Sequence, residues 1–102
     1  MLMDVLAEPM RRELLRSVWD EERTVGSLVE DFDVSQPAIS HHLRLLREAG
    51  LVGVRKDGQR RLYRAVPEAL GELRSYMEAY WADGLNRLAD EAELKARRAS
   101  NS

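Results

Sequence analysis

The sequence contains no cysteine, and this absence removes several kinds of chemistry at once. Disulfide bridges, thiolate metal sites, iron–sulfur clusters and cysteine nucleophiles are all excluded, and a cytoplasmic location is the simplest expectation. No window approaches the roughly 20 apolar residues that a bilayer requires, and no basic region followed by an apolar stretch opens the chain. We therefore expect no export segment and no contact with a membrane.

The chain also lacks the groupings that an enzyme needs. A catalytic centre requires a nucleophile with a convergent base, or paired carboxylates in a cleft, and neither is apparent, nor is a glycine-rich phosphate loop. The two histidines, His41 and His42, are adjacent, so on a helix they point about 100° apart and cannot chelate one ion together. We expect no enzymatic activity, no metal and no cofactor.

What the chain does have is a segregated charge. Its 102 residues have room for one domain, which we expect over residues 1–95, with a flexible basic tail over 96–102. Residues 36–66 hold seven basic and two acidic residues, a local charge of +5, whereas the rest holds 9 basic and 16 acidic residues, or −7. One basic face in an acidic protein favours a polyanionic partner, although an ordinary solvated charged surface is the alternative.

Apolar residues at helical spacing predict three helices in the first third of the chain. A short N-terminal helix comes first, and a second runs from near Pro9, which suits a first turn, to about Trp19. Thr24 is a plausible N-cap for a third, short helix that ends at Phe32.

A fourth helix is predicted from Ser35, an N-cap, to Ala49, with Pro37 in its first turn and Gly50 ending it. Its inward side carries Ile39, Leu43 and Leu46. The opposite side gathers polar residues and their flanking neighbours, namely Gln36, Pro37, Ser40, His41, Arg44 and Arg47. One face therefore belongs to the core and the other is free to contact a partner.

Asp57-Gly58 lies between two short apolar runs, which is a strong hairpin signal. Pro67 closes the second predicted strand. The tip and flanks of the hairpin are cationic and polar, with Arg55, Lys56, Gln59, Arg60 and Arg61.

From Glu68 the sequence predicts one long helix with a ridge of large apolar side chains spaced by three and four. The ridge contains Leu70, Leu73, Met77, Tyr80, Trp81, Gly84, Leu85 and Leu88. A small domain has little core left to cover this ridge, so we infer a homodimer. The alternative is that the helix packs back on its own domain.

This order of elements, mainly α with one small β-hairpin, is that of a winged helix-turn-helix. One α-helix fits the major groove, where Gln36 suits a bidentate contact with adenine and the Pro37 ring a thymine methyl group. Ser40 and His41 suit base edges or phosphates, and the arginines suit the backbone. The full set of candidate DNA-binding residues is Ser35, Gln36, Pro37, Ser40, His41, Arg44, Arg47, Arg55, Lys56, Gln59, Arg60 and Arg61.

Residues 34–52, VSQPAISHHLRLLREAGLV, resemble the recognition-helix signature of the arsenic-repressor (ArsR) family of bacterial transcription regulators. Residues 6–15 resemble that family's first block and residues 58–63 its wing. The resemblance implies a symmetric dimer, joined through both terminal helices, that binds a near-palindromic operator and represses transcription. The implied contact residues are Leu2, Val5, Leu6, Leu73, Met77, Tyr80, Trp81, Gly84, Leu85 and Leu88.

Two departures from the family pattern bear on sensing. Met10 stands where many members carry threonine, which affects only a local capping or phosphate contact. The cysteine pair of thiophilic-metal sensors is missing, and residues 68–102 contain no histidine for a zinc site, so we expect a metal-independent repressor. The alternatives are a repressor controlled by a small apolar ligand near Tyr76, Tyr80 and Trp81 at the dimer junction, or a winged helix used for protein contact.

Overall fold

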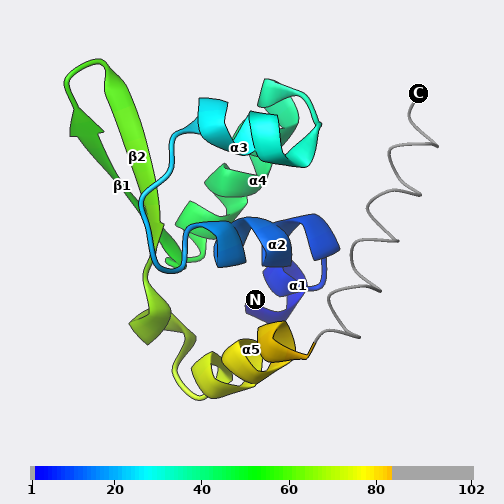
Figure 1. Cartoon of the computed structure of the whole chain (residues 1–102). Coiled ribbons are helices and arrows are strands. Elements are labelled where there is room, and N and C mark those ends of the chain that lie inside the picture. The colour runs from blue at the N-terminus through cyan, green and yellow to red at the C-terminus, as the bar shows by residue number, and fades with distance from the viewer. Residues whose placement is uncertain (1, 84–102) are drawn as a thin grey trace.

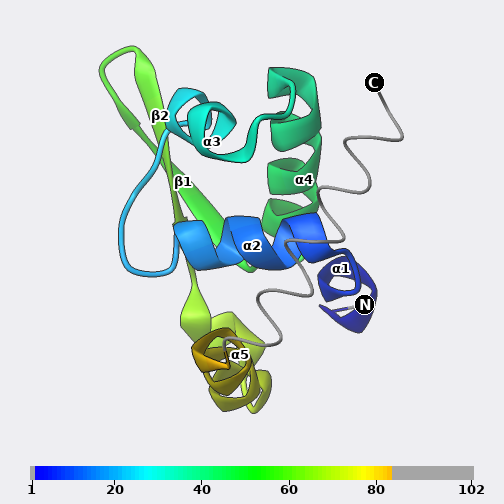
Figure 2. The ribbon, with the colours of Figure 1, turned by 45° about the vertical axis from the view of Figure 1, so that its right-hand side comes forward.

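A computed structural model describes residues 2–83, in which five α-helices surround a small core and one hairpin extends beyond them. The elements are α1 (Leu2–Leu6), α2 (Pro9–Ser17), α3 (Val25–Phe32), α4 (Gln36–Glu48), β1 (Val52–Asp57), β2 (Arg60–Ala65), a 3₁₀ turn η1 (Pro67–Leu70) and α5 (Leu73–Ala82). The hairpin tip and the start of α4 lie at one end of the molecule, and α5 lies at the other (Figures 1 and 2). The expected winged helix-turn-helix fold is confirmed.

The predicted caps begin α3 and α4. The Thr24 hydroxyl accepts a hydrogen bond from the Ser27 N–H at 3.1 Å, and the Ser35 hydroxyl accepts one from the Ala38 N–H at 3.3 Å. Each cap satisfies an N–H that has no partner within its own helix, which is typically worth about 1 kcal/mol. After α4, Gly50 has a φ of +80°, which turns the chain towards β1.

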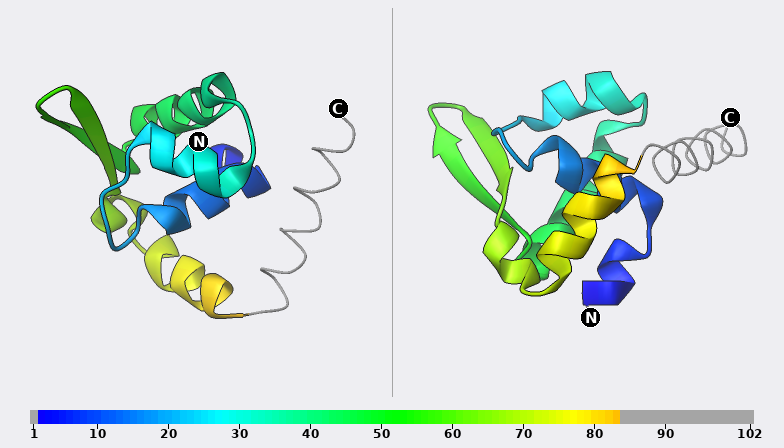
Figure 3. Two further views of the ribbon diagram at one scale, coloured as in Figure 1. Left: turned by 45° about the horizontal axis from the view of Figure 1, so that its top comes forward. Right: turned by 60° about the horizontal axis from the view of Figure 1, so that its bottom comes forward.

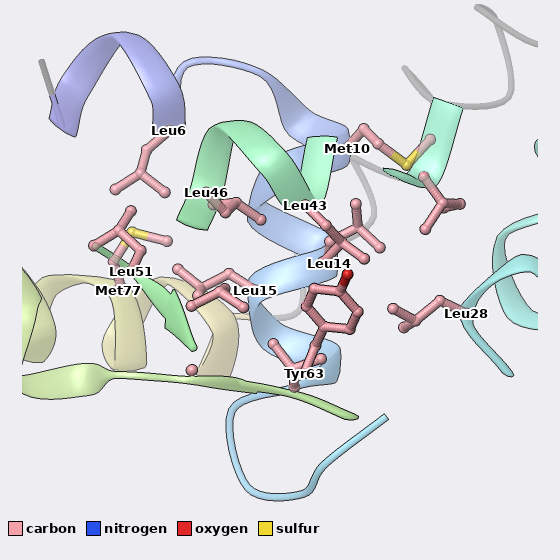
Figure 4. Close-up of a cluster of buried hydrophobic side chains, with 14 of the residues drawn as sticks. Leu6, Met10, Leu14, Leu15, Leu28, Leu43, Leu46, Leu51, Tyr63 and Met77 are labelled. Carbon is pink, nitrogen blue, oxygen red and sulfur yellow. The ribbon is translucent and has the colours of Figure 1, made fainter. Parts of the chain in front are cut away.

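The core lies between α2, α3 and α4. Seven leucine and isoleucine side chains there are fully buried, namely Leu14, Leu15, Leu28, Ile39, Leu43, Leu46 and Leu51. Figure 4 shows how the labelled members of this group converge with Tyr63 of β2 and Met77 of α5. Burial of each such side chain contributes roughly 1.5–3 kcal/mol, so the inward face of α4 is firmly held.

The prediction of a single long helix from Glu68 is wrong at the N-terminal end of that helix. The chain forms the 3₁₀ turn η1, breaks, and begins α5 only at Leu73 (Figure 3). The break lies at Gly71, whose φ of +56° is in the left-handed region that continuous helix does not use. The predicted ridge residues Gly84, Leu85 and Leu88, and the tail over 96–102, lie outside the described residues.

The described part of α5 packs back on the core of its own chain. Met77 and Trp81 are only 4% and 8% exposed, and the Trp81 ring meets the Trp19 ring edge to face at a centroid distance of 4.8 Å. Leu6 of α1 is 6% exposed. These three residues, assigned to the subunit contact from the sequence, are therefore core residues of the single chain. Of the other predicted contact residues that are described, Leu2, Val5, Leu73 and Tyr80 pack on the core and are partly buried.

The loop between α2 and α3 is joined to the hairpin, a contact that the sequence did not predict. Arg23 and Tyr63 exchange two backbone hydrogen bonds, at 2.9 and 2.8 Å, which add a short third strand segment to the outer edge of β2. This bridge fixes the base of the hairpin against the helices. None of the helices in the described part of the chain is long and apolar enough to span a membrane.

Candidate nucleic-acid interface

One face of α4 is free of the core and carries the predicted polar side chains. We call this the reading face, and its exposed members are Gln36, Pro37, Ser40, His41, Arg44 and Arg47. Ser35, the N-cap that precedes them, is exposed as well. The amphipathic division predicted for α4 is therefore confirmed, with Ile39, Leu43 and Leu46 buried on the opposite side.

Between α4 and β2 runs a concave surface of about 380 Å³, which we call the cationic groove. Its lining residues are Pro37, Ser40, His41, Arg44, Arg47, Arg61 and Tyr63. Three of them are arginines and none is acidic, so the groove presents positive charge next to hydroxyl and imidazole groups. Arg44 Nη2 donates to His41 Nδ1 at 3.2 Å, which joins two successive residues of the reading face.

The hairpin, which we call the wing, has a register that divides its cations between two faces. Asp57 pairs with Arg60, so Gly58 and Gln59 form a two-residue loop, and the Gly58 φ of +66° is typical of a type II′ turn. Directly opposed residues share a face of a two-stranded sheet. Lys56 therefore lies on the same face as Arg61, which lines the cationic groove.

Arg55 and Arg60 of the wing point to the far face and hold carboxylates there. Arg55 forms a bidentate ion pair with Glu22 of the α2–α3 loop, with N–O distances of 2.5 and 2.9 Å. The hydrogen bond from Arg55 lowers the pKa of the Glu22 carboxyl, and Glu22 in turn raises the pKa of Arg55. Arg60 binds Asp57 at 2.9 Å. Both arginines were predicted to contact DNA, and both already have an anionic partner.

His42, in contrast to His41, faces inward and is half-buried. Its Nδ1 lies 3.2 Å from Nη1 of Arg11 on α2. Burial lowers the pKa of His42 to about 4, and the charges of Arg11 and His41 act in the same direction. His42 is therefore neutral near pH 7, where its Nδ1 accepts from the guanidinium.

A second concave surface of about 470 Å³ lies between α1 and α5, far from the wing tip. We call it the apolar groove, and its lining residues are Met3, Leu6, Ala7, Arg12, Leu73, Tyr76, Met77 and Tyr80. Met3 and Tyr76 are 68% and 67% exposed, unusually high for large apolar side chains. Neither was among the subunit-contact residues predicted from the sequence, although Tyr76 was placed with Tyr80 and Trp81 in the alternative ligand site at the dimer junction.

Comparison with known proteins decides the family. The model of the family described as "Bacterial regulatory protein, arsR family" matches residues 8–54, from the end of the α1–α2 link into β1. The HTH-type transcriptional regulator Rv2034 of Mycobacterium tuberculosis is 37% identical over 84 residues, which cover 82% of this chain and 78% of that protein. The chain belongs to the ArsR family. It is a DNA-binding transcriptional regulator and not an enzyme.

Two further relatives of this ArsR-family protein agree with that assignment. The biofilm growth-associated repressor of Agrobacterium fabrum is 35% identical over 79% of this chain and 67% of its own length. A crystal structure described as "Possible transcriptional regulator for arsenical resistance" has 46% identity and a TM-score of 0.66, covering 87% of this chain and 93% of its own. Several other curated relatives are matched over only about half to two thirds of their length.

Because Arg60 and Arg61 lie on opposite faces of the wing, we predict different roles for them in DNA binding. Arg61→Ala should weaken binding to every DNA sequence alike and reduce the slope of log affinity against log salt by about 1, because one phosphate contact is lost. Arg60→Ala, its matched control, should change the slope much less, since Arg60 faces away and is paired with Asp57. A titration of both variants over a salt series measures the slopes. Equal changes would contradict the assignment of Arg61 to the groove.

The pKa of His42 predicts a pH-dependent stability. Below its ordinary value of 6.5, the unfolded chain takes up a proton on His42 that the folded chain does not bind until about pH 4. The free energy of unfolding should therefore fall as pH falls through this window. His42→Asn should make the fall shallower in denaturant titrations at successive pH values. An unchanged slope would show that His42 titrates alike in both states.

Proposed function

We propose that this ArsR-family regulator is a metal-independent dimeric repressor that acts in the cytoplasm and inserts α4 into the major groove of a near-palindromic operator. The observation that carries the proposal is the cationic groove, in which three arginines from α4 and β2 line one concave surface. A major groove about 12 Å wide admits one helix, and the wing then lies beside the neighbouring backbone.

The reading face offers distinct contacts along α4. Gln36, exposed in the first turn, suits a bidentate contact with adenine, and the neighbouring Pro37 ring suits a thymine methyl group. Ser40 and His41 follow one turn later, at base edges or phosphates. Arg44, Arg47 and Arg61 then neutralise backbone phosphates, which supplies affinity without reading sequence. Arg55 and Arg60 contribute less, because each holds a carboxylate.

The apolar groove is the proposed contact between two copies of the chain. A soluble domain rarely exposes two large apolar side chains in one depression, and Met3 and Tyr76 do so between α1 and α5. Pairing through α1 and α5 leaves both wings free, and a twofold axis then presents two α4 helices to successive turns of DNA, about 34–36 Å apart. Repression by such a pair is supported by the name of the Agrobacterium fabrum relative.

A second candidate is control of this repressor by a small apolar ligand. The apolar groove has a volume of about 470 Å³, within the range of roughly 300–1,000 Å³ that is usual for ligand sites. Within its apolar walls, Arg12 and the Tyr80 hydroxyl supply polar groups that would orient a ligand. Metal control is not favoured, because the chain has no cysteine and its two histidines are adjacent.

Selection of binding sites from random DNA tests the proposal. The purified protein should select half-sites centred about one turn apart, or a multiple of it, with or without a metal chelator. Gln36→Ala should lose about 1–3 kcal/mol of discrimination at one base pair in each half-site. Uniform weakening at all sequences would make Gln36 a phosphate contact. Failure to select any site, or a steady affinity across a salt series, would favour the protein-contact alternative.

Two aromatic residues of α5 separate folding from dimerisation. Trp81→Ala should cost on the order of 3–5 kcal/mol of folding stability, because Trp81 is buried against Trp19 within one subunit. Tyr76→Ala, on the exposed rim of the apolar groove, should leave the stability of the subunit within about 0.5 kcal/mol and weaken association. Denaturant titration and sedimentation at several concentrations measure the two effects. Unchanged association of Tyr76→Ala would remove the apolar groove from the subunit contact.

A further inference from the structure

Two neighbouring arginines near the start of α2 cap the carbonyl groups at the C-terminal end of α1. Arg11 Nε donates to the Val5 carbonyl at 2.6 Å, and Arg12 Nη1 donates to the Leu6 carbonyl at 2.7 Å. Carbonyls in the last turn of a helix have no partner within that helix, and α1 has only five residues. The position of α1 therefore depends on these two side chains as well as on its few packed residues.

The two guanidinium groups then reach different helices. Arg12 Nε donates to the Tyr80 hydroxyl of α5 at 3.2 Å, across the apolar groove. Arg11 Nη1 donates to Nδ1 of His42 on α4 at 3.2 Å. Because a guanidinium has no acceptor, the neutral His42 ring must carry its proton on Nε2. Arg12 thus joins α1 to α5, and Arg11 joins α1 to α4.

The contact with His42 lies directly behind the reading face. His42 follows His41, which lines the cationic groove, and it precedes Leu43, which is buried in the core. The buried side chains of α4 set which side of the helix faces the core, but because apolar contacts are not directional they constrain small rotations about the helix axis less than a hydrogen bond does. The hydrogen bond from Arg11 to one atom of His42 is directional and supplies that constraint.

We propose that Arg11 and His42 form a positioning pair that ties the end of α1, at the proposed subunit contact, to the orientation of α4. The inference rests on the proposed function, because orientation matters only if two α4 helices must meet successive turns of one operator. Breaking the pair weakens sequence-specific binding and leaves the attraction of the arginines of α4 and β2 for phosphates intact. Neither Arg11 nor His42 touches DNA in this arrangement.

The experiment compares operator with unrelated DNA of equal length. Arg11→Met keeps the aliphatic length but removes the donors, and it should weaken operator binding about tenfold, the effect of one charge-assisted hydrogen bond. Binding to unrelated DNA should change less than about twofold. Arg16→Met, on the same helix, is the charge-matched control, because among the described residues Arg16 shows no hydrogen bond or ion pair to α1 or α4.

Variants of His42 separate positioning from folding. His42→Asn places an amide oxygen near the position of Nδ1 and should retain most of the operator affinity, whereas His42→Leu should lose about tenfold, as Arg11→Met does. The double variant Arg11→Met/His42→Leu should lose no more than Arg11→Met alone, since Arg11→Met already removes the contact that His42→Leu removes. Additive losses, or equal losses on operator and unrelated DNA, would overturn the proposal. A wild-type protein that selects no operator would instead overturn the proposed function.

Discussion

The interface depends on one constraint, the burial of the inward face of α4 against α2 and α3. Ile39, Leu43 and Leu46 have almost no exposed surface, and all three belong to the buried cluster that includes leucines of α2 and α3. Since a helix that buries every third or fourth residue must turn the intervening ones outward, the same packing exposes Gln36 and Ser40 together. The packing of the core and the exposure of the reading face therefore both follow from the same helical period.

In the wing, side chains alternate between the two faces of the hairpin with a period of two residues. Because opposed residues share a face, one register brings Lys56 and Arg61 to the side of α4 and turns Arg55 and Arg60 away. A shift of one residue would exchange the two sets, and the ion pair between Arg55 and Glu22 opposes that shift. The backbone bridge from Arg23 to Tyr63 fixes the same strand from its other edge. Acidic Glu22 therefore contributes to the cationic groove by holding its wing in register.

Local signals in the sequence were sufficient for the helix-turn-helix and the hairpin. The Ser35 cap, Pro37 and Gly50 act within one turn of α4, so they predict its bounds without knowledge of the rest. The break at Gly71 was missed because the apolar spacing continues across it, although the backbone does not. Contacts between residues distant in the sequence could not be predicted from local patterns either. A periodic ridge shows that Met77 and Trp81 are covered but not whether their own subunit covers them, and arginines alone do not show which have acidic partners.

The charge distribution explains how an acidic protein can bind DNA without a general attraction to it. At physiological ionic strength the Debye length is about 8 Å, so a phosphate near the cationic groove responds to the arginines there and little to distant carboxylates. Residues outside 36–66 carry a charge of −7, and they repel a duplex that approaches any other way. The basic segment supplies both the hairpin and α4, and the hairpin tip and the start of α4 lie at one end of the molecule (Figure 2). In the proposed arrangement, productive approach is thereby limited to the orientation in which α4 can enter the major groove.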